Sequence, residues 1–146
     1  MFPYDNDGLN IDAHSRGSMT AGKKGMLDFE KRGIHGIAGN TSINLFAPAY
    51  NAQSMANTLD YLSDGKQTSV GLENHADDFV GIVFGKNPAT FDKIPSGSGP
   101  WNEAWRIFTT YPTVHACYGH GSDVCISFYG SSHRIQIDSI KPRSKK

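Results

Sequence analysis

The sequence predicts an α/β fold, in which a mostly parallel sheet is flanked by helices. Two apolar runs of strand length, residues 42–47 and 68–74, enclose a segment at 52–62 whose apolar residues recur at helical spacing. Strands that alternate with helices are typical of parallel sheets, because each helix returns the chain to the same end of the next strand. The 16 glycines agree with a fold that contains many turns.

The rest of the chain extends this alternation. In order, we expect a strand at 9–13, a helix at 17–32, a strand at 42–47, a helix at 52–62, a strand at 68–74, a short helix or strand at 79–84, an exposed loop at 85–100 and a helix at 101–111. The last helix has Trp101, Trp105 and Phe108 on one face, which we expect to pack in the core. Residues 114–118 are predicted as a short strand or its end, and a pair of strands at 125–129 and 134–140 would complete the sheet.

Length and charge narrow the class of protein. The 146 residues are enough for one domain, predicted at 1–140, followed by a basic flexible tail at 141–146. Lys plus Arg and Asp plus Glu number 14 each, so net charge does not favour a nucleic-acid partner. No apolar run has the length of a membrane span, and no signal peptide follows Met1.

The sequence Ala13-His14-Ser15-Arg16-Gly17 has the pattern of a nucleophile elbow. In such an elbow a serine stands at a tight turn between a strand and a helix, and small residues two positions before and after it avoid a clash. The pattern predicts Ser15 as a nucleophile, with the backbone N–H of Arg16 as an oxyanion donor and His14 in the pocket. The alternative is that Ser15 only caps the following helix.

A serine nucleophile needs a histidine base and a carboxylate that orients the base. The chain supplies both in the order Ser, Asp, His that α/β-hydrolases use. Asp78 follows the strand at 68–74 and His115 lies near the end of the last predicted parallel strand, so both would lie near Ser15 at the carboxyl edge of the sheet. Asp77 is the alternative acid. His120 is the main alternative to His115 as the base, and His75 is the next. If His120 is not the base, we expect it to line the pocket.

Several strands precede the elbow in a typical α/β-hydrolase, whereas this chain reaches it within the first fifteen residues. The chain is therefore either part of a longer polypeptide or a reduced α/β-hydrolase-like fold. The second oxyanion donor normally comes from a loop upstream of the elbow, so its source is open, and loss of one donor costs about a hundredfold or more in rate.

The cysteines and histidines predict no metal centre. Cys117 and Cys125 are eight positions apart, and either a disulfide or two free thiols fits that spacing. None of the usual zinc-ligand spacings occurs, and no phosphate-binding loop follows a predicted strand. We therefore expect no metal and no cofactor.

Four segments carry a resemblance to a known family. They are AHSRGSMTAG at 13–22, NLFAPAYNAQ at 44–53, NHADDFVGIVFGKNPAT at 74–90 and TVHACYG at 113–119. Together they resemble the C-terminal region of bacterial filamentous-haemagglutinin and contact-dependent-inhibition exoproteins, over about residues 9–130. The elbow also resembles that of small bacterial lipases. The first resemblance implies a secreted or delivered toxin or effector module with a cognate immunity protein; the second implies Ser15, Asp78 and His115 as the catalytic set.

These observations predict a serine hydrolase that cleaves a lipid or small ester, with transient contact to a membrane. Two other functions stay open. In an RNase-type toxin, His115, His120, Arg134 and the basic tail would act on RNA, and Ser15 would be structural. In an inactive hydrolase-like module, the domain would serve only delivery or interaction.

Overall fold

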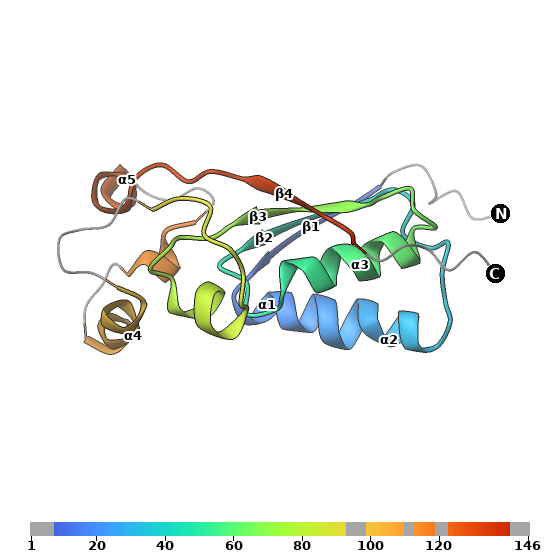
Figure 1. The fold of residues 1–146 in the computed structure, drawn as a ribbon, viewed down its shortest axis with the longest axis horizontal. Helices are drawn as coiled ribbons and strands as arrows, with labels where there is room; N and C mark the ends of the chain where they lie inside the picture. Colours follow the sequence, from blue (N-terminus) through green and yellow to red (C-terminus); the bar gives the residue numbers. More distant parts are fainter. Residues whose placement is uncertain (1–7, 93–98, 110–112, 119–122, 141–146) are drawn as a thin grey trace.

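The computed structural model describes residues 8–92, 99–109, 113–118 and 123–140. Its centre is a four-stranded sheet in the order β1-β2-β3-β4 (Figure 1). The strands are β1 (Leu9–His14), β2 (Thr41–Phe46), β3 (Ser69–Glu73) and β4 (Ile135–Asp138). The first three are parallel, and β4 runs antiparallel to β3. The prediction of an α/β fold with a mostly parallel sheet is therefore confirmed.

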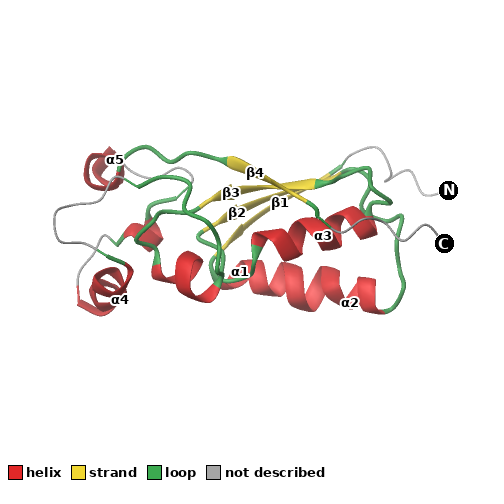
Figure 2. Ribbon diagram, viewed as in Figure 1, coloured by secondary structure: helices red, strands yellow, loops and turns green. Residues whose placement is uncertain are grey.

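The helices that connect the parallel strands cover one face of the sheet (Figure 2). A continuous helical segment, made of α1 (Arg16–Met19), the π-helix η1 (Thr20–Met26) and α2 (Leu27–Lys31), joins β1 to β2. The helix α3 (Ala52–Leu62) joins β2 to β3. Crossovers between parallel strands are right-handed. Because the strands follow one another across the sheet in chain order, successive crossover helices lie on the same face of the sheet.

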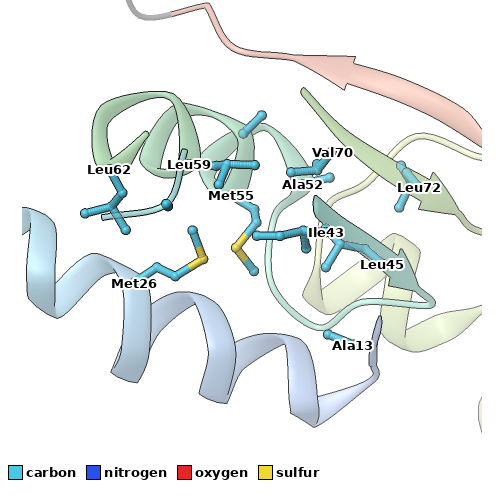
Figure 3. Packing of buried hydrophobic residues seen from close by; sticks show 12 residues of the cluster. Ala13, Met26, Ile43, Leu45, Ala52, Met55, Leu59, Leu62, Val70 and Leu72 are labelled. Carbon is cyan, nitrogen blue, oxygen red and sulfur yellow. The ribbon is translucent and has the colours of Figure 1, made fainter. Parts of the chain in front are cut away.

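Alternation along the strands decides which residues enter the core. Ile43 and Leu45 of β2 and Leu72 of β3 point to the helices, where they pack with Met55 and Leu59 of α3 (Figure 3). The residues that alternate with them along the strands point to the opposite face of the sheet and are mostly polar. For example, the side-chain amide of Asn44 donates a hydrogen bond to the Asp12 carboxylate over 2.8 Å. One face of the sheet is thus apolar and covered, and the other carries hydrogen-bonding side chains.

The turn between β2 and α3 is held by two asparagines. The side chain of Asn51 accepts a hydrogen bond from the Ser54 N–H over 3.0 Å and so caps α3. Asn87, in the loop after the next strand, accepts from the Ala52 N–H over 2.7 Å and donates to the Pro48 carbonyl over 3.0 Å. These bonds connect the carboxyl edge of β2 with the segment that follows β3.

A second group of short helices lies beyond that edge. It comprises the π-helix η2 (Val80–Phe84), α4 (Pro100–Thr109), the 3-10 helix η3 (Val114–Ala116) and α5 (Asp123–Tyr129). A small apolar cluster of Val114, Cys117, Cys125 and Tyr129 holds η3 against α5. This group carries the residues predicted as base and acid to the edge where β1 ends.

Several predictions for this region were wrong. Residues 114–118 contain a 3-10 turn and residues 125–129 a helix, so His115 does not follow a strand; the apolar periods were too short to separate strand from helix. Trp101 and Trp105 are exposed, not in the core. The side chain of Phe108, the residue His120 and the predicted tail at 141–146 lie outside the described residues.

In the part of the chain that the structure describes, no helix has the length and apolar character of a transmembrane span.

The close approach of η1 to α3 requires Gly22. A Cβ at Gly22 would lie 2.6 Å from Tyr50 Cδ1 and 2.9 Å from Met55 Cε, whereas a Cβ at Gly25 would meet only Thr20 O at 3.5 Å. We expect Gly22→Ala to lower the free energy of unfolding by about 1–3 kcal/mol relative to Gly25→Ala, because overpacking outweighs the helix propensity of alanine. Urea unfolding of both variants measures the difference; equal stabilities would contradict this packing.

Candidate active site

Ser15 stands between β1 and α1 in a backbone conformation that side-chain-bearing residues rarely adopt, with φ 51° and ψ −124°. Such a conformation costs about 1–3 kcal/mol and persists only where surrounding bonds hold it. The Ser15 N–H donates to the Phe46 carbonyl over 3.1 Å. Its carbonyl accepts from the Ala49 N–H over 3.2 Å and from the Ser18 hydroxyl over 2.6 Å. The strained turn is therefore bonded to β2, to the loop after β2 and to α1.

The side chain of Ser15 does not cap the helix. Ser15 occupies the N-cap position of α1, but its hydroxyl makes no capping hydrogen bond. Its Oγ lies 2.9 Å from Nε2 of His115, a residue one hundred positions away. Ser15 thus occupies the N-cap position, as the capping alternative predicted, but its hydroxyl does not cap the helix.

His115 is also bonded to Asp78. Its Nδ1 lies 3.1 Å from both Oδ1 and Oδ2 of that carboxylate. With the Nδ1 proton directed at Asp78, Nε2 is left as the acceptor for the Ser15 hydroxyl. The three residues predicted as nucleophile, base and acid are therefore brought together in one hydrogen-bonded chain.

The carboxylate of Asp78 is fully buried and has further donors. Its Oδ1 accepts from the backbone N–H groups of Val80 and Gly81, over 2.9 and 3.1 Å, at the beginning of η2. Its Oδ2 accepts from the Tyr118 hydroxyl over 2.8 Å. A buried carboxylate is tolerated when its lone pairs are filled in this way, and it then has a fixed position from which to orient His115.

Tyr118 contributes an interaction that sequence reasoning missed. Its hydroxyl also accepts from the His75 backbone N–H over 2.9 Å, which connects β3 to the segment of His115. Burial, and then the charge of Asp78, raise the pKa of Tyr118 well above its usual value, so the hydroxyl stays protonated and donates to Asp78. No spacing in the sequence marks a tyrosine for this role.

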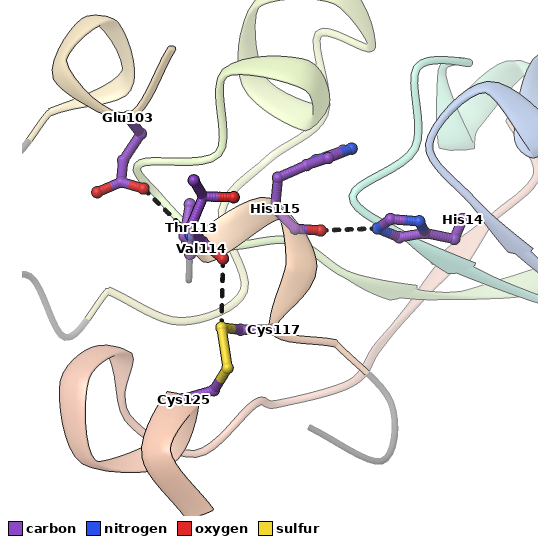
Figure 4. Close-up of a disulfide and its surroundings, with 7 residues drawn as sticks. All are labelled: His14, Glu103, Thr113, Val114, His115, Cys117 and Cys125. Carbon is purple, nitrogen blue, oxygen red and sulfur yellow. Dashed lines mark hydrogen bonds between the residues drawn. A yellow bond between two sulfur atoms is a disulfide. The ribbon is translucent and has the colours of Figure 1, made fainter. Parts of the chain in front are cut away.

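The turn that carries His115 is held from three sides (Figure 4). The buried carboxylate of Glu103 accepts from the Val114 N–H over 3.1 Å. Cys117 and Cys125 form a disulfide, one of the two states that their spacing allows. His14 Nε2 lies 2.8 Å from the His115 carbonyl oxygen, and the two imidazole rings are 4.8 Å apart. The side chain at 14 therefore supports the base.

Asp77 and His75, the alternative acid and base, make other contacts. Asp77 is buried, and its backbone N–H donates to Nδ1 of His75 over 3.0 Å, whereas Asp78 contacts His115. His75 is buried between the rings of Phe91 and Tyr129. The predicted clash at position 17 is not found: beyond its chain neighbours and the backbone of its own helix, a Cβ at Gly17 would meet no described atom within 4 Å.

An open cavity of about 550 Å³ adjoins the site on the polar face of the sheet. Its lining includes His14 and Tyr118, and Arg134, which pairs with Glu73 over 2.9 Å. The predicted pocket residue His14 thus lines a cavity. Within the described residues, no group of three or more His, Cys, Asp or Glu side chains is arranged to hold a metal ion.

The lowered pKa of His14 predicts that the stability of the folded chain depends on pH. Burial is the largest cause that lowers its pKa below the ordinary 6.5, and the neighbouring His115 lowers it further, although the hydrogen bond to the His115 carbonyl opposes both. A lowered pKa in the folded state means that the unfolded chain binds the proton more readily. Stability contributed by neutral His14 is therefore present above pH 6.5 and is lost as pH falls below it.

We expect the wild type to lose more stability than His14→Gln between about pH 7.5 and about pH 5, as measured by urea unfolding at both values. A constant difference between the two proteins across this range would contradict the assignment.

No protein-family model matches the chain, and neither a curated protein nor a solved structure matches it. The geometry of Ser15, His115 and Asp78 therefore carries the functional argument.

Proposed function

We propose that this protein is a serine hydrolase that cleaves acyl esters through an acyl-Ser15 intermediate. The observation that carries the proposal is the continuous hydrogen bonding from Ser15 Oγ through the His115 ring to the buried Asp78 carboxylate. The strained backbone of Ser15 supports it, because such strain at an exposed turn is typical of nucleophile elbows. The same features favour an α/β-hydrolase-like arrangement of the parallel strands.

Acylation begins when Ser15 Oγ attacks the ester carbonyl carbon and passes its proton to Nε2 of His115. The imidazolium that forms is stabilised by the Asp78 carboxylate, which remains ionised. When the tetrahedral intermediate collapses, the bond to the alcohol oxygen breaks and His115 gives its proton to that oxygen. The products of this stage are the free alcohol and an acyl ester on Ser15.

Deacylation repeats the sequence with water. His115 takes a proton from the water as it attacks the acyl carbon, and then returns that proton to Ser15 Oγ as the acyl–oxygen bond breaks. The released product is a carboxylic acid, and Ser15 is restored. Asp78 keeps the same imidazole orientation in both stages, because its oxygens are bonded to the backbone of η2 and to Tyr118.

We assign one oxyanion donor to the backbone N–H of Arg16. Arg16 is the first residue of α1, where the backbone N–H has no acceptor inside the helix. This N–H stands beside the nucleophile, and the positive end of the helix dipole favours the developing negative oxygen. A lipid or small ester is the proposed substrate; delivery as an effector and an immunity partner stay predictions.

Labelling with a fluorophosphonate probe tests the nucleophile. We expect the wild type to be labelled and Ser15→Ala to be unlabelled, because only an activated serine reacts with such a probe. Ser42→Ala, which removes an exposed hydroxyl on the polar sheet face, is the control and should label as the wild type does. A folded wild type that does not react would contradict the proposal.

Two neighbouring carboxylates allow a matched test of the acid. Asp78→Asn should lower kcat/KM for an activated ester by about 10³–10⁴, because an amide favours the wrong imidazole tautomer. Asp77→Asn should change kcat/KM by less than about tenfold, because Asp77 is not bonded to His115 and an amide fills nearly the same volume. Similar losses in the two variants would refute the assignment of Asp78.

A further inference from the structure

In helix α4, two aromatic side chains are exposed and a carboxylate is buried. Trp101 and Trp105 are four residues apart, hence on one side of the helix, and their side chains are 71% and 72% exposed. On the side that faces the protein, Glu103 is 1% exposed and bonds to the Val114 N–H and to Arg106. A surface helix normally buries its aromatic residues and exposes its carboxylates. The reversal indicates that the two tryptophans serve a contact outside this domain.

The tryptophans belong to a larger aromatic surface. The Phe79 ring lies 5.1 Å from the ring of Trp101 and 5.2 Å from that of Phe84, which is 64% exposed. We call Phe79, Phe84, Trp101 and Trp105 the aromatic patch. Because Phe79 directly follows Asp78, the patch adjoins the segment that holds the triad acid.

A positively charged groove lies along the α1–α2 segment. It has a volume of about 590 Å³ and is lined by Arg16, Met19, Thr20, Lys23, Lys24, Asp28 and Lys31. Four cations thus face one carboxylate, although the chain as a whole has no net charge. Arg16 directly follows Ser15, so this basic groove begins beside the nucleophile.

We propose that the aromatic patch and the basic groove together dock the protein on a bilayer that contains anionic phospholipids. Helix α4, the helical turn that follows β3, and the α1–α2 segment reach the same lower edge of the molecule in Figure 1. The groove includes Arg16, which follows Ser15, and the patch includes Phe79, which follows Asp78, so both features adjoin the Ser15–His115–Asp78 chain. The inference deepens the proposed function, since it names a membrane phospholipid ester as the substrate class.

The two features match the two parts of a membrane surface. Tryptophan favours the boundary between headgroups and acyl chains, where its ring is in apolar surroundings and its N–H remains hydrated. Lysine and arginine are attracted to anionic headgroups, and several such contacts add up to stable binding. An acidic protein would satisfy the basic groove but would leave the separate aromatic patch exposed.

Vesicle binding by the Ser15→Ala protein tests the proposal without hydrolysis. We expect it to sediment with vesicles of phosphatidylcholine plus phosphatidylglycerol, more weakly with phosphatidylcholine alone, and less as salt is raised. The tryptophan emission should shift to shorter wavelength in the anionic vesicles. Absence of binding to anionic vesicles would overturn the proposal, and would point to a macromolecular partner for the patch.

Matched substitutions in the same background locate the surface. Lys24→Glu should weaken partitioning by about tenfold or more, whereas Lys66→Glu, an exposed change after α3, should not. Trp101→Ala combined with Trp105→Ala should weaken it similarly, whereas Tyr61→Ala, on the exposed side of α3, should not. Equal binding by the test and control variants, each shown to be folded by circular dichroism, would overturn the proposal.

A further measurement separates this inference from the proposed function. Fluorophosphonate labelling of the wild type reports the nucleophile whether or not vesicles bind. Labelling without vesicle binding would leave the hydrolase and overturn the membrane surface. Vesicle binding without labelling would leave the surface and overturn the hydrolase.

Discussion

The buried carboxylate of Asp78 is the group on which the arrangement of the site depends. It receives hydrogen bonds from two backbone N–H groups of η2, from the Tyr118 hydroxyl and from His115. The donors come from two parts of the chain after β3, the beginning of η2 and the segment 115–118. A carboxylate that is buried away from water is stable only when hydrogen-bond donors surround it. This requirement of Asp78 both holds the region after β3 together and orients His115.

A separate set of hydrogen bonds holds Ser15, the proposed nucleophile. Ser15 is held by β2, by the loop after β2 and by Ser18, all of which belong to the sheet and its helices. His115, the proposed base, is held by Glu103, by His14 and by the turn that the disulfide closes. The hydroxyl and the imidazole therefore meet where two differently stabilised parts of the molecule come together. A small shift between those parts would lengthen the 2.9 Å contact between Ser15 and His115.

Helix α4 serves both the site and the surface. Its buried Glu103 fixes the turn of His115, and this requirement turns Trp101 and Trp105 outward. A helix that must place a carboxylate inside exposes its opposite side, and here that side is aromatic. The support of the base and the proposed membrane contact are thus two consequences of the same helix orientation.

Local patterns in the sequence determined most of the sheet and its helices. The helix at 52–62 and the strands at 42–47 and 68–74 could be predicted because apolar periodicity is a local property of a few residues. The elbow pattern and the order of Ser15, Asp78 and His115 also selected the three residues that the structure brings together.

Only the tertiary structure decided the rest. The 3-10 turn of His115, the hydrogen bond from the Tyr118 hydroxyl to Asp78 and the outward tryptophans all depend on contacts between residues far apart in the chain. Such contacts have no period and no fixed spacing, so they become visible only when the chain has folded.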